Sequence, residues 1–175
     1  MPPRTLGHRR PRARPVFIGA IGLITHRLSE GRALYVDALG LPLRRAKGAR
    51  FLYSTKLGGG RYFGVWPLFE AARVCFGSQR WPARRPVPQL FIELEMPSPA
   101  AVRAAASELE SRGYPLLHGA RVDAWGQTVA RLQTKEGLLI GISYVPWMHR
   151  RPKRRKSRPR RAGSGARGSG GRRGR

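Results

Sequence analysis

The chain has 175 residues, enough for one compact domain with a substantial core or for two small modules that share one. Its 35 Lys and Arg outnumber its 9 Asp and Glu, which gives a formal net charge of +26. Residues 16–148 hold 17 of the basic side chains and all 9 acidic ones, so the excess charge lies at the two ends. No segment approaches the ~20 consecutive apolar residues of a membrane span, so we expect no membrane partner.

The cysteine content points to a reducing compartment. Cys75 is the single cysteine, so the chain forms no intramolecular disulfide, and we expect a soluble cytoplasmic protein. Its neighbours Val74 and Phe76 predict a buried, unreactive thiol rather than a nucleophile.

The two ends are too polar and too basic to build a core. We expect residues 1–15 to be a disordered basic arm and residues 148–175, rich in Arg, Gly and Ser, to be a disordered basic tail. Such a tail binds polyanions, including nucleic acid, without sequence preference, because each neutralised phosphate releases a counterion. An evolved nucleic-acid role and a solvated appendage both remain open.

The first half of the apolar region, residues 16–66, predicts a strand, a helix and further strands. Phe17–Thr25 is the first strand, and a helix follows with Ser29 as its N-cap and Gly40 as its stop signal. Short apolar clusters between residues 44 and 56 predict two more strands. Tyr62–Trp66 follows a triple-glycine turn and predicts the last strand of this half.

The second half begins after a connector, residues 67–88, in which residues 69–75 predict a short helix. Residues 89–96 alternate in polarity, which predicts a strand with two distinct faces. One face carries Leu90, Ile92, Leu94 and Met96; the other carries Gln89, Phe91, Glu93 and Glu95. Ser98 and Gly113 then bound the clearest helical pattern of the chain.

A strand at residues 115–121 and a hairpin, with strands at residues 128–133 and 138–142, complete the second half. Residues 16–66 and 89–147 thus share one element order, which is an internal repeat. We predict an α+β fold of two tandem βαβββ modules, whose curved sheets enclose a cavity.

Two local patterns resemble a known family. Trp125-Gly126 precedes a strand that ends in the charged turn Thr134-Lys135-Glu136-Gly137, and residues 34–43 form an aromatic helix end closed by Leu-Gly. The chain in this respect resembles the vicinal oxygen chelate superfamily, which includes glyoxalases, bleomycin resistance proteins and extradiol dioxygenases. The resemblance implies the paired-module fold, and it implies a homodimer by analogy, because members often pair modules between chains.

The resemblance also implies where a metal ion would bind. The superfamily takes metal ligands from the first and last strands of each module, and the matching positions are Ala20, Gly64, Gln89 and Gly141. Three of these four side chains offer no donor, whereas a divalent cation needs roughly three or more, so we expect no metal cofactor. A displaced divalent site formed by Gln89, Glu93 and His118 is the alternative. The competing expectation is that Glu93 pairs with a cavity arginine such as Arg131 and that His118 is a hydrogen-bonded edge or core histidine.

The same glycines predict space for an apolar ligand. The aromatic candidates for the cavity wall are Trp66, Phe91, Trp125 and Tyr144. The polar groups that would orient a ligand are Gln89, Glu93 and Gln127. We therefore expect a protein that binds or transforms a small organic molecule without the usual metal. A metal-dependent lyase or dioxygenase with a displaced site, and polyanion binding through the tail, are the alternatives.

Overall fold

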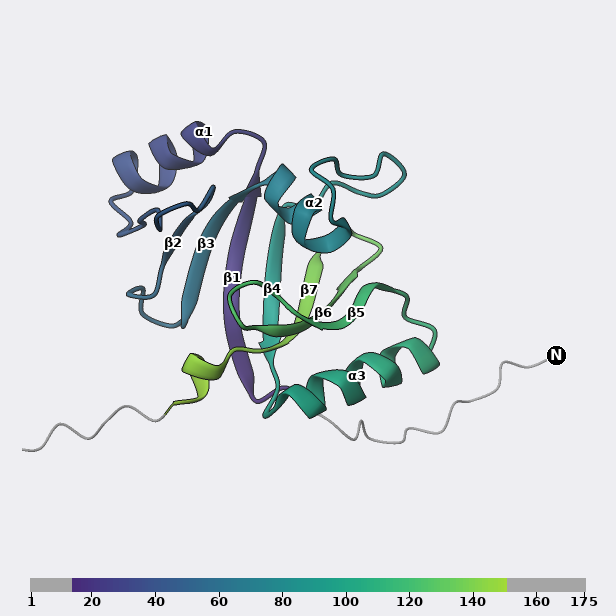
Figure 1. Ribbon diagram of the computed structural model, residues 1–175. Coiled ribbons are helices and arrows are strands. Elements are labelled where there is room, and N and C mark those ends of the chain that lie inside the picture. Colours follow the sequence, from purple (N-terminus) through teal and green to yellow (C-terminus); the bar gives the residue numbers. More distant parts are fainter. Residues whose placement is uncertain (1–13, 151–175) are drawn as a thin grey trace, which may run out of the picture.

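The computed structural model describes residues 14–150, which form one mixed seven-stranded sheet with three α-helices (Figure 1). The strand order is β2-β3-β1-β4-β7-β6-β5. The strands are β1 (Phe17–Thr25), β2 (Leu52–Ser54), β3 (Tyr62–Pro67), β4 (Leu90–Glu95), β5 (Leu116–Val122), β6 (Thr128–Gln133) and β7 (Leu139–Tyr144). The α+β class predicted from the sequence is confirmed. The expected basic arm and tail lie almost wholly outside the described residues.

The two halves of the chain meet at the centre of the sheet. β1 and β4 pair antiparallel there, while β1 pairs parallel with β3 and β4 pairs parallel with β7. The halves therefore join edge to edge into one continuous sheet.

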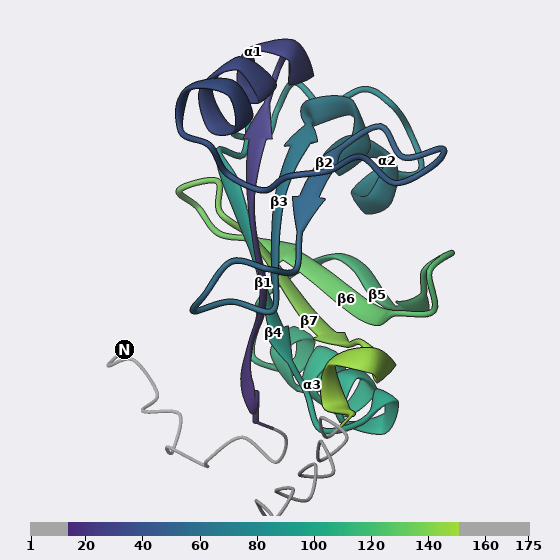
Figure 2. The ribbon, with the colours of Figure 1, turned by 90° about the vertical axis from the view of Figure 1, so that its left-hand side faces the viewer.

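The helices cover opposite faces of this sheet, as strand alternation shows. On the outer face, Val65 packs with residues around α1 (Leu28–Arg32), and α3 (Pro99–Ser111) covers β6 and β7. On the inner face, α2 (Leu68–Phe76) packs Ala71, Val74 and Cys75 against Trp66. Figure 2 shows α1 and α2 near one end of the central strands and α3 near the other.

The predicted helix boundaries have mixed outcomes. Ser98 caps α3 as expected, because its hydroxyl accepts a hydrogen bond from the Ala101 amide at 3.1 Å. Ser29 is not a cap: α1 begins one residue earlier, with Arg27 at the N-cap, and continues into the π-helical turn η1 (Ala33–Ala38). The expected stop at Gly40 is confirmed by its φ of 68°.

The first half has fewer strands than the second. The two strands expected between residues 44 and 56 are reduced to the three residues of β2 and an isolated bridge between Arg44 and Tyr53. The second half contains all four expected strands. The reduction has a physical reason: the segment before β2 is basic and glycine-containing, and it offers few apolar side chains to bury.

The C-terminal boundary of the packed region lies later than expected. Pro146–His149 forms the 3-10 turn η2, in which Met148 is buried while Trp147 is half exposed. Packing therefore extends beyond the predicted last packed residue, Trp147. Within residues 14–150, no helix has the length and apolarity needed to cross a membrane.

Candidate ligand-binding cavity

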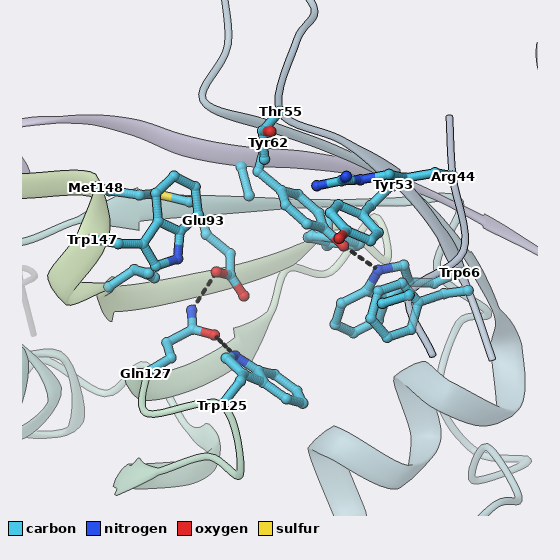
Figure 3. A pocket seen from close by; sticks show the side chains of 15 residues that line it. Arg44, Tyr53, Thr55, Tyr62, Trp66, Glu93, Trp125, Gln127, Trp147 and Met148 are labelled. Atoms are coloured by element: carbon cyan, nitrogen blue, oxygen red, sulfur yellow. Dashed lines mark hydrogen bonds between the residues drawn. The ribbon is translucent and has the colours of Figure 1, made fainter. Parts of the chain in front are cut away.

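The inner face of the sheet contains a cavity of about 450 Å³ (Figure 3). Its lining comes from β1, β3 and β4, from the segment before β3, from the loop before β6 and from the C-terminal turn. The lining residues are Ala20, Arg44, Ala46, Phe51, Tyr53, Thr55, Tyr62, Trp66, Phe91, Glu93, Trp125, Gln127, Val145, Trp147 and Met148. Their side chains are mostly aromatic or apolar, as is usual for small-molecule sites.

Aromatic rings in mutual contact form the wall. The Trp66 ring lies with its centroid 4.7 Å from that of Phe91 and 5.1 Å from that of Phe51, and it meets Trp125 edge-on at 6.4 Å. Tyr53 and Tyr62 stack with centroids 5.7 Å apart. Such contacts hold each ring in place, so the wall is preformed.

Glycines let these rings approach the sheet. Gly22 and Gly64 are directly paired on β1 and β3. A Cβ at Gly22 would lie 1.9 Å from Phe91 Cε1, and one at Gly64 would lie 3.0 Å from Trp66 Nε1. The space that we expected Gly64 to leave for a ligand is therefore occupied by the protein's own aromatic rings.

A buried carboxylate forms the polar floor. Glu93 is 6% exposed, and Gln127 Nε2 donates a hydrogen bond to its Oε2 while Arg131 donates one to its Oε1 at 3.1 Å. Gln127 Oε1 in turn accepts from Trp125 Nε1 at 2.6 Å (Figure 3). Burial raises the pKa of Glu93, opposed by the Arg131 charge and by the hydrogen bond from Gln127.

Arg131 is a buried cation behind this floor. It is 4% exposed and lies between two carboxylates, since its second terminal nitrogen is 3.2 Å from Asp123 Oδ2. Burial alone would lower the pKa of Arg131, but Glu93 and Asp123 raise it above its ordinary value. The guanidinium therefore stays charged and compensates the carboxylates around it.

Comparison with solved structures identifies the fold. A Mn(II)-bound glyoxalase from Novosphingobium aromaticivorans matches 74% of this chain and 38% of its own, with a TM-score of 0.50 and 19% sequence identity. This chain has the fold of the glyoxalase/bleomycin resistance protein/dioxygenase superfamily. A superfamily member from Vibrio splendidus covers 74% of this chain and 100% of its own, with a TM-score of 0.49 and 14% identity.

A methylmalonyl-CoA epimerase from Mycobacterium tuberculosis covers 81% of this chain and 96% of its own, with a TM-score of 0.46 and 15% identity. No family model and no curated protein matches the chain. At these identities the superfamily likeness concerns the fold alone.

The strand register shows which residues occupy the centre of this superfamily fold. Ala20 pairs with Tyr62 on one side and Glu93 on the other, and Glu93 pairs with Gly141. Glu93, rather than Gln89, is thus the β4 residue in line with Ala20 and Gly141. A Cβ at Gly141 would lie 3.0 Å from Glu93 Cγ, so this glycine makes room for the Glu93 side chain.

These residues do not fit a superfamily-type metal centre. Ala20 and Gly141 carry no donor atom, and both oxygens of Glu93 already accept hydrogen bonds, one of them from a cation. Across the described part of the chain, no group of three or more His, Cys, Asp and Glu side chains is arranged to hold a metal ion. The positive charge next to the carboxylate is the buried Arg131 guanidinium, 3.1 Å from Glu93 Oε1.

The structure brings together five of the eight predicted site residues. Trp66, Phe91, Glu93, Trp125 and Gln127 all line the cavity. The predicted pairing of Glu93 with Arg131 is confirmed.

The other three predicted residues lie outside the cavity lining. Gln89 is exposed, because β4 begins after it and its carbonyl pairs with the Ile24 amide at the strand end. Tyr144 packs on the α3 side, since alternation along β7 turns it to the outer face. His118 Nδ1 lies 2.8 Å from the Gly119 carbonyl oxygen and its Nε2 faces Arg131 at 3.4 Å, so the displaced set of Gln89, Glu93 and His118 does not converge.

Several lining residues were missed from the sequence. Tyr62 lies four residues before Trp66 on one strand, so alternation alone places both on one face and could have predicted it. Tyr53 is the middle residue of the three-residue strand β2, and Arg44 lies in the irregular segment before it. Trp147 and Met148 lie in a turn whose position depends on distant contacts. No periodic signal marks these four positions.

Proposed function

We propose that this protein binds a small organic molecule with a planar, largely apolar body in the cavity, without a divalent cation. The observation that carries the proposal is the combination of a preformed aromatic wall with a single compensated carboxylate at the floor. Planar ligands gain most from such a wall, because ring stacking adds to the burial of apolar area.

The polar groups of the cavity would orient such a ligand. The Tyr62 hydroxyl accepts a hydrogen bond from Trp66 Nε1 at 3.2 Å, which leaves its own proton to donate. Burial raises the pKa of Tyr62, so the hydroxyl remains protonated and a donor. A ligand acceptor atom near the Tyr62 hydroxyl would match this donor.

Binding is better supported than catalysis. A general base needs an accessible oxygen, whereas both Glu93 oxygens already accept hydrogen bonds. Cys75 is 1% exposed, and burial raises the pKa of its thiol to about 11, so it is not a nucleophile at neutral pH. The buried single cysteine also favours the proposed cytoplasmic location.

Tryptophan fluorescence tests the proposal directly. Three of the 4 tryptophans line the cavity, and the fourth, Trp81, packs on Phe76 outside it. We expect a neutral aromatic quencher such as 4-nitrobenzyl alcohol to give saturable quenching. Replacing the lining residue Ala46 with Phe should weaken the apparent affinity on the order of tenfold, about 1.4 kcal/mol, by filling space.

A Trp81→Phe variant is the matched control, and it should retain the saturable signal. Quenching that is linear in quencher concentration, or that is equal in wild type and Ala46→Phe, would contradict binding in the cavity. Polyanion binding through the tail stays a separate prediction, tested by removing residues 151–175 and measuring nucleic-acid retention at low salt.

A further inference from the structure

The segment that closes one side of the cavity is strongly basic. Residues 41–66 contain six Lys and Arg and no Asp or Glu. Arg44, Ala46, Phe51, Tyr53 and Thr55 of this segment all line the cavity. Arg45 and Lys47, which flank Ala46, and Lys56, which follows Thr55, are exposed beside these lining positions. Any ligand in the cavity therefore lies next to a basic rim.

Arg44 is the basic side chain that lines the cavity itself. Its guanidinium carbon lies 5.2 Å from the centroid of the Tyr53 ring, and the two residues exchange both backbone hydrogen bonds at 2.9 Å. The paired backbone and the Tyr53 ring together position the Arg44 guanidinium beside the cavity. Within residues 14–150, none of the ion pairs involves Arg44. Figure 3 shows it on the same side of the cavity as Tyr53 and Tyr62.

The cavity holds no charge that compensates Arg44. Glu93 is the acidic side chain among the lining residues that the structure describes, and its charge is matched by the buried Arg131 at 3.1 Å. The remaining lining side chains are neutral. Arg61 is engaged elsewhere, since it donates to the Met148 carbonyl oxygen and lies over the Phe17 ring at 4.3 Å. Within residues 14–150, no ion pair therefore occupies the N–H donors of the Arg44 guanidinium at the rim.

We infer that the ligand is an aromatic anion, with its planar body against the aromatic wall and its anionic group on the Arg44 guanidinium. A planar carboxylate suits the guanidinium best, because two parallel N–H···O hydrogen bonds can form. The basic neighbours of Arg44 would add to the attraction and to the rate of capture. This inference rests on the proposed function, since it names the ligand class of the same cavity.

A matched ligand series tests the preference for an anion separately from binding in the cavity. We would titrate the full chain by calorimetry with 4-nitrobenzoate, 4-nitrophenyl phosphate and the neutral isostere 4-nitrobenzamide, at low and high salt. We expect the carboxylate to bind about tenfold more tightly than the amide at low salt, and the difference to shrink in high salt. The phosphate arm shows whether the rim prefers a planar or a tetrahedral anion.

An Arg44→Gln variant should remove the preference for the carboxylate over the amide. Arg80→Gln is the charge-matched control, because Arg80 is exposed and lies outside the cavity lining. Retained preference in Arg80→Gln and lost preference in Arg44→Gln would support the inference.

Equal affinities of wild type for carboxylate and amide would overturn the inference and leave the proposed function standing. A preference that persists in Arg44→Gln would overturn the assignment of the anion to Arg44. Tighter binding of the phosphate than of the carboxylate would overturn the planar-anion preference. If no member of the series binds, the proposed function itself is contradicted.

Discussion

Glu93 and Glu95 lie two residues apart on β4 and face the same side of the sheet, yet their surroundings differ. Glu93 is 6% exposed, lines the cavity and pairs with the buried Arg131. Glu95 is 0% exposed and lies outside the cavity lining. Its Oε1 accepts from the Ser143 hydroxyl at 2.5 Å, and its Oε2 accepts from the Val145 amide at 2.8 Å and lies 2.9 Å from His149 Nε2.

The difference shows two ways to bury a carboxylate. Glu93 depends on a neighbouring cation for compensation, whereas Glu95 depends on several hydrogen-bond donors from the C-terminal end of the described chain. Ser143 and Val145 precede η2 and His149 is its last residue, so these contacts hold the turn that carries Trp147 and Met148 to the cavity. One glutamate therefore forms the floor of the cavity, and the other holds part of its wall.

Removing the cation should have the largest effect. Arg131→Met leaves the buried Glu93 without its cation and leaves Asp123 with Arg121 at 3.8 Å, so we expect a loss of about 3–5 kcal/mol in the free energy of unfolding. Urea denaturation measures it. Adding Glu93→Gln and Asp123→Asn to Arg131→Met should restore much of the loss. A loss below about 1 kcal/mol in the single variant would contradict the dependence of Glu93 on Arg131.

Neutralising the other glutamate should cost less. Glu95→Gln keeps the size of the side chain but weakens its hydrogen bonds, so we expect about 2–3 kcal/mol of destabilisation. It should also raise the mobility of Trp147, seen as a change in its fluorescence. Ser143→Ala removes one of these hydrogen bonds and serves as the milder control. A larger loss in the free energy of unfolding for Glu95→Gln than for Arg131→Met would contradict the predicted order of the two effects.

Packing beside Glu93 can be probed without changing charge. Gly22→Ala places a methyl group against the Phe91 ring, so we expect a loss of about 1–2 kcal/mol and weaker ligand binding. Gly119→Ala is the matched control, since no atom lies within 4 Å of its added Cβ. Combining Gly22→Ala with Phe91→Leu should recover stability. An equal effect of the two glycine substitutions would count against the close packing.

The reactivity of the Cys75 thiol measures local opening of the packing beside Glu93, because Cys75 packs in the cluster that contains Trp66 and Phe91. Burial raises the pKa of its thiol from 9.0 to about 11. The contribution of this thiol to stability is therefore full below about pH 9 and is lost as the pH rises through about 11. Native protein should react slowly with a thiol reagent at pH 8. Arg131→Met should accelerate the reaction more than Glu95→Gln. Equal acceleration would contradict the predicted difference between the Glu93 and Glu95 sites.

Sequence patterns predicted which face of a strand each side chain occupies better than they predicted the register between strands. Alternation placed Phe91, Glu93 and Glu95 on one face of β4, and the pairing of Glu93 with Arg131 followed from burying a carboxylate near an arginine. Local signals also predicted the hairpin of β6 and β7 and the cap at Ser98.

The failures share a physical cause, because register between distant strands is set by tertiary packing. Gln89 has the right alternation but lies just before the first residue of β4. Matching it to the superfamily's ligand position overlooked that Glu93 is the β4 residue in line with Ala20. Tyr144 was placed on the wrong face of β7. Arg44 and Trp147 lie in irregular segments, where no period predicts which way a side chain points.

Metal content with direct titration tests the central claim that an internal ion pair takes the place of a metal centre in this cavity. Protein purified without chelator should hold well under one equivalent of Mn, Fe, Ni or Zn, and calorimetric titration with Mn²⁺ should show no stoichiometric site that depends on Glu93. One equivalent of tightly held metal in wild type that is lost in Glu93→Gln would contradict the account.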